Sequence, residues 1–461
     1  MVNLLRLLNR VPSGLGTLLS PKAKLIPNTP FLLPTRQPKV FLSSKAHGQA
    51  RHIPPPSGSL TPSLLSLPLV SSTTLNPAAN VGKWLLGTSA FISTIVAVGG
   101  VTRLTKSGLS MTTWSALGGR PPKDEQEWME EFELYKSSPE FGQRESMDLD
   151  EFKNIYYWEW GHRMLGRCAG VIFVVPFTYF AARGRIPKGY YPRMLTLLGL
   201  GGTQGLIGWW MVKSGLGDDR RGDHKEIRVS PYRLAVHLST AFLTYSVCLW
   251  TGLDLLHPKE AMVAAGETLR KTSQSALPKL KNLRVGAIGT TALVATTVVS
   301  GAFVAGNDAG NAYNDWPYMN GQWVPSDIID PTLKDAWRNI FESTGMVQFD
   351  HRMLAYFSTA AVAGLYAYAM NLKAYLTPQS SRSLTFMGLA LTTQVTLGVT
   401  TLMLYVPVPL AACHQLGSLA LLSSGLYAVH SLRYVGVAVG RRGAAKAVSD
   451  GAAAAKRLIK N

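Results

Sequence analysis

The sequence predicts an all-α polytopic membrane protein, with eight transmembrane helices arranged as two parallel-repeat four-helix bundles. Three observations support this fold class. The chain contains eight apolar segments with almost no charge, each about 20 residues long, which is the length a helix needs to cross a bilayer core of about 30 Å. The connections between these segments alternate in charge, and the motif His-Arg-Met-Leu occurs once in each half, at 162–165 and at 351–354.

The apolar segments account for most of the chain after its N-terminal region. In lipid every backbone polar group must be satisfied internally, so segments of this length predict helices. We expect a four-helix N-terminal half at 83–256, a linker at 257–284, a four-helix C-terminal half at 285–433 and a tail at 434–461. The eight segments lie at 83–102, 157–182, 194–213, 233–256, 285–305, 347–371, 384–406 and 410–433.

Residues 1–82 differ in composition from the rest of the chain. They contain eight Lys or Arg residues and no Asp or Glu, and the first acidic residue of the chain is Asp124. A basic, acid-free, Ser-rich N-terminus predicts a mitochondrial transit peptide; the alternative is a basic tail on a bacterial or plasma-membrane protein. Because eight of the nineteen excess positive charges lie here, the net charge of +19 does not indicate nucleic-acid binding.

The loops predict which side of the membrane each segment end faces. The loop 103–155 holds eleven acidic and seven basic residues, and the loop 306–346 is also acidic, whereas the connections after the second, fourth, sixth and eighth segments are basic. By the positive-inside rule, both termini lie on the basic side. In a mitochondrial inner membrane that side is the matrix, and the acidic loops face the intermembrane space.

Matching residues recur in the two halves in the same order. Four crossings return the chain to its starting side, so the two halves predict a parallel repeat. The spacing between matched residues shrinks along the chain because the loops differ in length. The matches are His162 with His351 at an offset of 189, Gly108 with Gly310 and Trp114 with Trp316 at 202, Gln204 with Gln394 at 190, and His237 with His414 at 177.

Four histidines occupy equivalent places in the repeat: His162, His237, His351 and His414. All four fall in the first turns of even-numbered segments, which enter from the acidic side, so their imidazoles are expected at similar depth. Facing helices of a bundle build cofactor sites from such side chains, and two imidazoles on one haem give a six-coordinate iron. The alternatives are polar caps near the membrane interface and zinc. The sequence lacks a four-ligand Cys/His cluster for zinc and a CxxCH motif for covalent haem attachment.

The two halves differ beside the first histidine of each pair. Glu159 lies three residues before His162 and on the same helical face, whereas the offset of 189 places Gln348 at the equivalent position. If one half carries out chemistry, the half with the carboxylate is the reactive one; the alternative is a Glu favoured by the helix dipole. Arg163 and Arg352 directly follow a histidine and are expected either to pair with haem propionates or to reach the membrane interface.

With these residues considered together, the chain resembles the heme A synthase family, in its mitochondrial form. The resemblance covers about residues 80–435. In contrast to some bacterial members, the loop 103–155 contains no Cys. The matching stretches are Gly99-Gly100-Val101-Thr102-Arg103-Leu104-Thr105, Glu159-Trp160-Gly161-His162-Arg163, Gly205-Leu206-Ile207-Gly208-Trp209-Trp210-Met211-Val212, Asp350-His351-Arg352, and the segments of His237 and His414.

The resemblance implies an oxidoreductase that converts the C8 methyl of heme O to the formyl of heme A for cytochrome c oxidase. It implies that His162 and His237 bind the substrate haem, that His351 and His414 hold a cofactor haem b, and that Glu159 matches the functional carboxylate of the family. It also implies a multi-pass protein of the mitochondrial inner membrane. Its implied partners are heme O synthase and a ferredoxin-type electron donor. Apart from the resemblance, a homo-oligomer is compatible with the sequence, and no nucleic-acid partner is expected.

Two other functions fit parts of the pattern. A di-haem electron-transfer protein of the cytochrome b type also uses pairs of histidines, but it normally places haems towards both membrane faces. A haem or small-molecule transporter would account for parallel repeats, but it requires no difference between Glu159 and Gln348. The identity of the bound pigments distinguishes all three functions.

Overall fold

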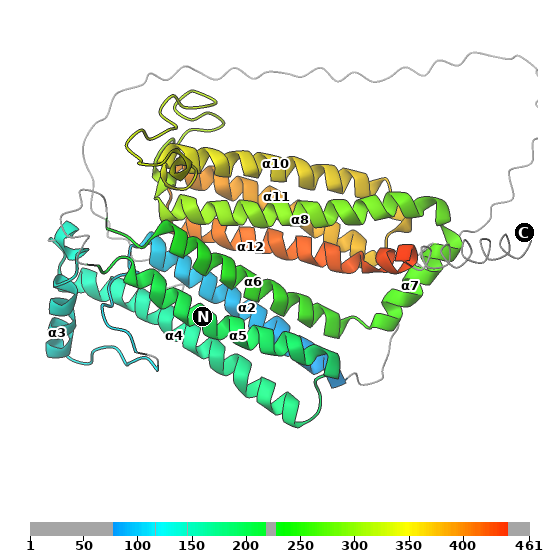
Figure 1. The fold of residues 1–461 in the computed structure, drawn as a ribbon, viewed down its shortest axis with the longest axis horizontal. Helices are drawn as coiled ribbons and strands as arrows, with labels where there is room; N and C mark the ends of the chain where they lie inside the picture. The colour runs from blue at the N-terminus through cyan, green and yellow to red at the C-terminus, as the bar shows by residue number, and fades with distance from the viewer. Residues whose placement is uncertain (1–76, 116, 145, 218–226, 441–461) are drawn as a thin grey trace, which may run out of the picture. The chain divides into compact units, whose positions relative to one another are not determined.

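The computed structural model describes residues 77–115, 117–144, 146–217 and 227–440, and in these residues the chain is helical without a β-strand. Eight of the described helices have 23 to 34 residues, and each covers one predicted segment, although α10, α11 and α12 end up to three residues before their segments do (Figure 1). The predicted all-α fold is therefore confirmed. The predicted transit peptide, except its last six positions, and residues 441–461 lie outside the described part.

The first four long helices form one group. Helix α2 (Pro77–Leu104) packs against α4 (Leu149–Ala182) and α6 (Pro231–Leu256), and α5 (Tyr191–Lys213) closes the group between α4 and α6. Figure 1 shows these four helices side by side. This arrangement brings α4 and α6, which carry His162 and His237, to one shared interior.

The last four long helices repeat this arrangement. Helix α8 (Leu277–Gly306) packs against α10 (Thr344–Met370) and α12 (Val408–Ser431), and α11 (Pro378–Met403) contacts both α10 and α12. The two groups meet where α6 contacts α8 and α12, and where α12 contacts α2. The α6–α8 and α12–α2 contacts are equivalent by the predicted repeat, so the junction between the groups is itself approximately symmetric.

Among the described residues, six helices are long and apolar enough to cross a membrane: α2, α4, α6, α8, α10 and α11. Helices α5 and α12 have the length but contain many small or polar residues. Helix α5 has five glycines together with Arg193 and Gln204, and α12 has four serines together with His414 and Gln415. Their place among the spanning helices therefore stays a prediction.

All eight helices begin before the predicted apolar segments, and four of them begin six or eight residues early. Helix α2 starts at Pro77, α4 at Leu149, α8 at Leu277 and α11 at Pro378, so residues 77–82 and 277–284, expected in a lead-in and a linker, are helical. The side chain of Asp148 caps α4 by accepting hydrogen bonds from the two backbone amides Asp150 N and Glu151 N, at 3.0 and 2.8 Å. Hydropathy marks the lipid-crossing part of a helix, whereas capping and packing outside it decide where the helix starts.

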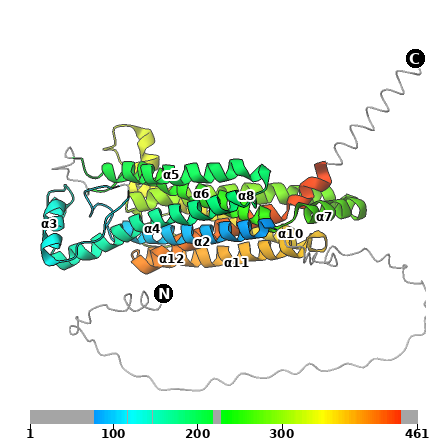
Figure 2. The same ribbon diagram turned by 90° about the horizontal axis from the view of Figure 1, so that it is seen from below.

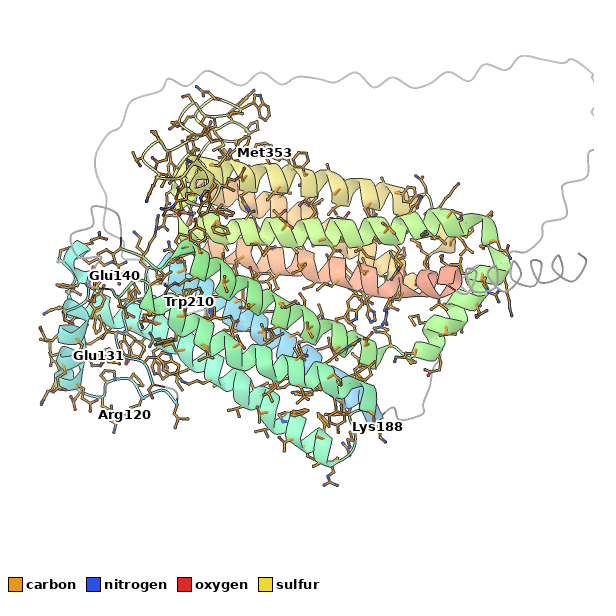
Figure 3. All side chains as sticks on the ribbon, in the orientation of Figure 1. Arg120, Glu131, Glu140, Lys188, Trp210 and Met353 are labelled. Atoms are coloured by element: carbon orange, nitrogen blue, oxygen red, sulfur yellow. The ribbon has the colours of Figure 1, made fainter. Side chains whose placement is uncertain are left out.

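Short helices lie at the two ends of the bundle, as Figure 2 shows. At one end α3 (Glu125–Lys136) packs on the extended start of α4 through Trp128, Phe132, Tyr135 and Phe152. At the other end α7 (Lys259–Thr272) joins the two groups. Figure 3 places Glu131 and Glu140 at the α3 end and Lys188 at the opposite end, in agreement with the acidic and basic sides of the loops.

A buried charged cluster joins the two groups near their basic ends. Asp254 of α6 accepts hydrogen bonds from Arg193 of α5 at 2.5 Å, from His430 of α12 at 3.1 Å and from Arg433. The side chain of Asp254 is 5% exposed. Its contacts therefore tie the N-terminal group to the end of the C-terminal group.

Replacing Asp254 by Asn is expected to destabilise the protein. Removing one charge of a buried ion-pair network leaves its partners uncompensated, which typically costs about 3–5 kcal/mol. The temperature of thermal unfolding in detergent should therefore fall. Asp150→Asn, at a side chain that is 91% exposed, should leave it unchanged, and an equal shift for the two variants would contradict a bridging role for Asp254.

Candidate functional site

Each of the four predicted histidines packs on a glycine of another helix in its own group. A Cβ atom added to Gly99 of α2 would lie 2.7 Å from Cε1 of His162, and one added to Gly208 of α5 would lie 3.2 Å from Cε1 of His237. The corresponding distances are 3.1 Å for Gly301 with His351 and 2.8 Å for Gly398 with His414. A larger residue at any of the four glycines would press on the imidazole, so the glycines fix where the histidine rings lie.

The four glycines follow the same spacing as the rest of the repeat. Gly99 and Gly301 differ by 202, and Gly208 and Gly398 differ by 190, which are the offsets found for other matched residues of the same helices. The sequence alone does not show that these glycines lie next to histidines. Gly99 and Gly208 lie in the stretches shared with the heme A synthase family, but only the packing of the helices shows that they contact histidines.

The structure brings the first histidine pair together. The ring centroids of His162 on α4 and His237 on α6 are 6.5 Å apart, and the ring planes are nearly perpendicular, at 82°. Two imidazole nitrogens that bind one metal ion from opposite sides, each about 2 Å from it, are about 4 Å apart. Their ring centroids are then about 6 Å apart. The spacing of the pair therefore fits axial ligation of one haem iron.

The Nε2 atoms of all four histidines are free of protein hydrogen bonds within the described part of the chain. The four side chains are half-buried. Half-buried imidazoles with a nitrogen that no protein group uses have the chemistry expected of axial haem ligands. By contrast, no group of three or more His, Cys, Asp or Glu in the described residues could hold a bare metal ion.

Neighbouring polar groups orient two of the rings. Gln204 of α5 lies 3.1 Å through Nε2 from Nδ1 of His237, and Thr240 donates to Gln204 Oε1 at 2.7 Å. Ser300 of α8 lies 2.7 Å from Nδ1 of His351. These contacts hold the ring planes and the direction in which Nε2 points. At His351 the Ser300 hydroxyl can accept from Nδ1–H, which leaves the Nε2 lone pair free for a metal ion. Nδ1 of His162 and of His414 is buried without a well-formed hydrogen bond to any described residue.

The histidines lie at different positions along their helices. His237, His351 and His414 are six or seven residues from the first residue of their helices, in the second turn. His162 is thirteen residues from Leu149 and lies in the fourth turn. The prediction that all four occupy first turns is wrong for His162, because α4 extends outward by two turns to pack against α3.

Glu159 is buried and has three hydrogen-bond donors. Its Oε2 atom accepts from Ser110 Oγ at 2.7 Å and from the backbone amide of Met111 at 2.8 Å, and its Oε1 atom accepts from Arg163 at 2.5 Å. The side chain is 3% exposed. Hydrogen bonds of this kind stabilise the carboxylate form. Glu159 therefore places a negative charge one turn before His162.

Gln348 contacts the equivalent loop of the second group, but it donates hydrogen bonds to the loop where Glu159 accepts them. Its amide nitrogen donates to the backbone carbonyls of Ala309 and Ala312 at 2.6 and 2.5 Å, and its amide oxygen accepts from Arg352 at 2.7 Å. Glu159 cannot donate hydrogen bonds as a carboxylate. The first loop therefore presents a backbone N–H to Glu159, whereas the second loop presents carbonyl oxygens to Gln348. Each loop has the backbone groups that match its own residue, a carboxylate or an amide.

Arg163 and Arg352 hold equivalent loop carbonyls. Each arginine also contacts the residue four positions before it, Glu159 or Gln348. Pairing of these arginines with haem propionates stays a prediction. The equivalent acceptors, both at an offset of 202, are Met111 O at 3.0 Å and Thr113 O at 2.8 Å for Arg163, and Tyr313 O at 2.5 Å and Asp315 O at 3.1 Å for Arg352.

Replacing Gly99 by Ala is expected to displace the His162 imidazole, and so to remove a haem ligated by the predicted pair His162 and His237 while leaving a haem at the other pair in place. The added Cβ at 2.7 Å from the His162 ring forces the imidazole to move, because real Cβ contacts are longer than 3.0 Å. Gly87→Ala on the same helix is the matched control, since a Cβ there meets nothing within 4 Å. Haem content per chain, measured from absorbance of the purified variants, checks this. Equal content in both variants would show that Gly99 does not position the ring.

Comparison with known proteins identifies the family to which this chain belongs. The model of the family described as cytochrome oxidase assembly protein (COX15-CtaA) matches residues 82–426, which include all four histidines and Glu159. The chain belongs to this family.

Relatives within this family extend over most of both chains. Heme A synthase COX15 of Bos taurus is 45% identical over 359 residues, covering 77% of this chain and 82% of that protein. Heme A synthase of the bacterium Parvibaculum lavamentivorans is 40% identical, covering 76% of this chain and 94% of that protein. A heme A synthase-mitochondrial ferredoxin fusion protein of Schizosaccharomyces pombe is 42% identical, covering 78% of this chain and 61% of that protein.

Proposed function

We propose that this protein is a heme A synthase, an oxidoreductase that converts the C8 methyl of heme O to the formyl of heme A for cytochrome c oxidase. The observation that carries the proposal is the pair His162 and His237, whose ring centroids are 6.5 Å apart in a glycine-lined interior. Membership of the cytochrome oxidase assembly protein family, with relatives named heme A synthase over three quarters of the chain, agrees with it.

The two histidine pairs have different roles. His162 and His237 bind the substrate heme O, and His351 and His414 hold a haem b. A haem b held by His351 and His414 would supply one-electron redox chemistry for the oxidation. Two features favour this assignment: the buried carboxylate of Glu159 occurs only in the first group, and Ser300 orients His351 by a 2.7 Å contact in the second.

Glu159 acts as a fixed negative charge and a positioning group. Its three donors, one of them the guanidinium of Arg163, favour a carboxylate that stabilises positive charge developing on the substrate over one that shuttles protons. The same contacts hold the loop at Ser110 and Met111 next to the His162 helix. Arg163 and Arg352 hold loop carbonyls, and propionates that reach the loops would find their guanidinium groups at the rim of each site.

In the membrane we propose eight spanning helices in two parallel repeats, located in the mitochondrial inner membrane. Both termini are in the matrix, and the haem sites lie towards the intermembrane space. The equivalent glycine–histidine and arginine–carbonyl contacts of the two groups support the repeat. The acidic loops at the α3 end and the basic loops at the other end support the orientation.

The proposed partners follow from the reaction. Heme O synthase supplies the substrate, and a ferredoxin-type protein exchanges electrons. A relative in Schizosaccharomyces pombe is a fusion of heme A synthase with a mitochondrial ferredoxin, which places the two activities in one chain there. Association into a homo-oligomer is compatible with the large exposed apolar side chains of the spanning helices.

The experiment that tests the proposed activity uses cells that make heme O but no heme A. Expression of the full chain should convert heme O to heme A, detected by chromatography and mass analysis of the extracted haems. Unchanged heme O alongside a protein that has bound haem b would instead favour a di-haem electron-transfer protein of the cytochrome b type.

A further inference from the structure

A second buried carboxylate lies in the first outer loop, and none of the roles assigned so far uses it. Glu140 is 5% exposed and precedes the short 3₁₀ helix Phe141–Gln143, between α3 and α4. Figure 3 shows it at the end of the bundle where α3 packs on α4. It lies outside the spanning parts of the helices, at the aqueous face towards which the first histidine pair is placed.

The contacts of Glu140 are much weaker than those of Glu159. Tyr135 Oη donates to its Oε2 atom at 3.3 Å, and Arg144 approaches its Oε1 atom no closer than 3.7 Å. Lys106 and the negative charge of Glu159 also act on it through space. A buried carboxylate with one long hydrogen bond and one long ion pair is poorly compensated for the water it has lost.

Burial raises the pKa of Glu140 to about 7, and repulsion from Glu159 adds to the effect, while Arg144, Tyr135 and Lys106 oppose it. Burial also raises the pKa of Tyr135, so its phenol keeps its proton and remains a donor at neutral pH. Glu140 therefore changes its charge close to the pH at which the protein works, which is the property needed for proton exchange.

Glu140 and Glu159 border the same cluster of side chains. Tyr135, the donor to Glu140, packs in that cluster together with Ile155. The hydroxyl of Ser110 lies 3.3 Å from the Ile155 carbonyl oxygen and donates to Glu159 at 2.7 Å. In the second group no acidic residue of the outer loop 307–343 is buried. The outer loop of the first group thus has a buried carboxylate, Glu140, near the buried Glu159, and the described outer loop of the second group has none.

We propose that Glu140 is the proton-exchanging carboxyl of the first group, accepting protons released when the substrate is oxidised there and passing them to water on the acidic side. The proposal rests on the proposed function. In each cycle the Glu140 carboxylate binds one proton and becomes a carboxylic acid, then releases that proton to solvent and regains its negative charge; no electron moves.

Infrared titration of the purified protein tests the ionisation without any turnover. A carboxylic-acid band that disappears as the pH rises through about 7 is expected, and Glu140→Gln should remove it. Glu133→Gln is the matched control, because Glu133 lies in α3 on the surface with a side chain 62% exposed, and should keep the band. A band near pH 7 that survives in Glu140→Gln would overturn the assignment.

The pH profile of heme A formation tests the role. The rate should rise through about pH 7, because Glu140 must be ionised to accept a proton, and Glu140→Gln should abolish this rise and lower the rate about 100-fold at unchanged haem content. Tyr135→Phe, which removes a donor to the carboxylate, should move the rise to higher pH. An unaltered profile in Glu140→Gln would overturn the role. Absence of heme A formation in the unmodified protein would count against the proposed function, while the infrared titration would still decide the ionisation of Glu140.

Discussion

Replacing His351 by alanine should remove one haem b from each chain and stop heme A formation. The imidazole of His351 packs on Gly301 and is oriented by Ser300 at 2.7 Å, so no neighbouring side chain takes its place as a ligand. Loss even of an orienting contact around a metal site typically costs about 10- to 100-fold in affinity. Loss of a ligand itself should therefore lower the haem b content by at least about tenfold.

The comparison variant is His430→Ala. This histidine is buried in the Asp254 cluster at the opposite end of the bundle and is not in either proposed haem site. It should reduce stability without removing a haem selectively. Absorbance and extracted-haem analysis distinguish the two variants, and equal haem b loss in both would mean that His351 acts through folding and not as a ligand.

Replacing Glu159 by glutamine should block heme A formation while the chain keeps its haems. The amide oxygen can still accept from Ser110 and Met111, but the amide N–H₂ then faces the guanidinium of Arg163, where the carboxylate accepted at 2.5 Å. A displacement of about 1 Å at a reacting group can cost about 100-fold in rate. We therefore expect heme A formation to fall about 100-fold.

Glu151→Gln serves as the matched control, because Glu151 is an exposed residue in the first turn of the same helix. It should leave both haem content and heme A formation unchanged. Loss of haem together with activity in Glu159→Gln would reduce the role of Glu159 to folding of the outer loop. Full activity in that variant would remove it from the mechanism.

Much of the helical fold could be predicted from the sequence, because lipid-crossing helices leave long uncharged segments. Hydropathy does not reveal the contacts that helices make outside the lipid. The early start of α4 depends on the Asp148 cap and on packing against α3, and it moved His162 from the expected first turn to the fourth. The less apolar α5 shows the converse, since two of the residues that lower its hydropathy, Gln204 and Gly208, lie against His237.

The candidate site was predictable in its residues but not in its geometry. The repeat selected four histidines and the difference between Glu159 and Gln348. It could not show that a glycine lies against each ring, because a glycine in an apolar helix has many uses. Nor could spacing alone show that three donors surround Glu159, or that Glu140, which has no match in the repeat, is buried beside the same cluster.

The most direct test of the account is pigment analysis of the purified full chain alongside His162→Ala and His351→Ala. Haem b together with heme O or heme A should be found in the unmodified protein. His162→Ala should lose the heme O or heme A and keep haem b, and His351→Ala should do the reverse. Two copies of haem b in the unmodified protein, with each variant losing one of them, would contradict a substrate site in the first group and a cofactor site in the second.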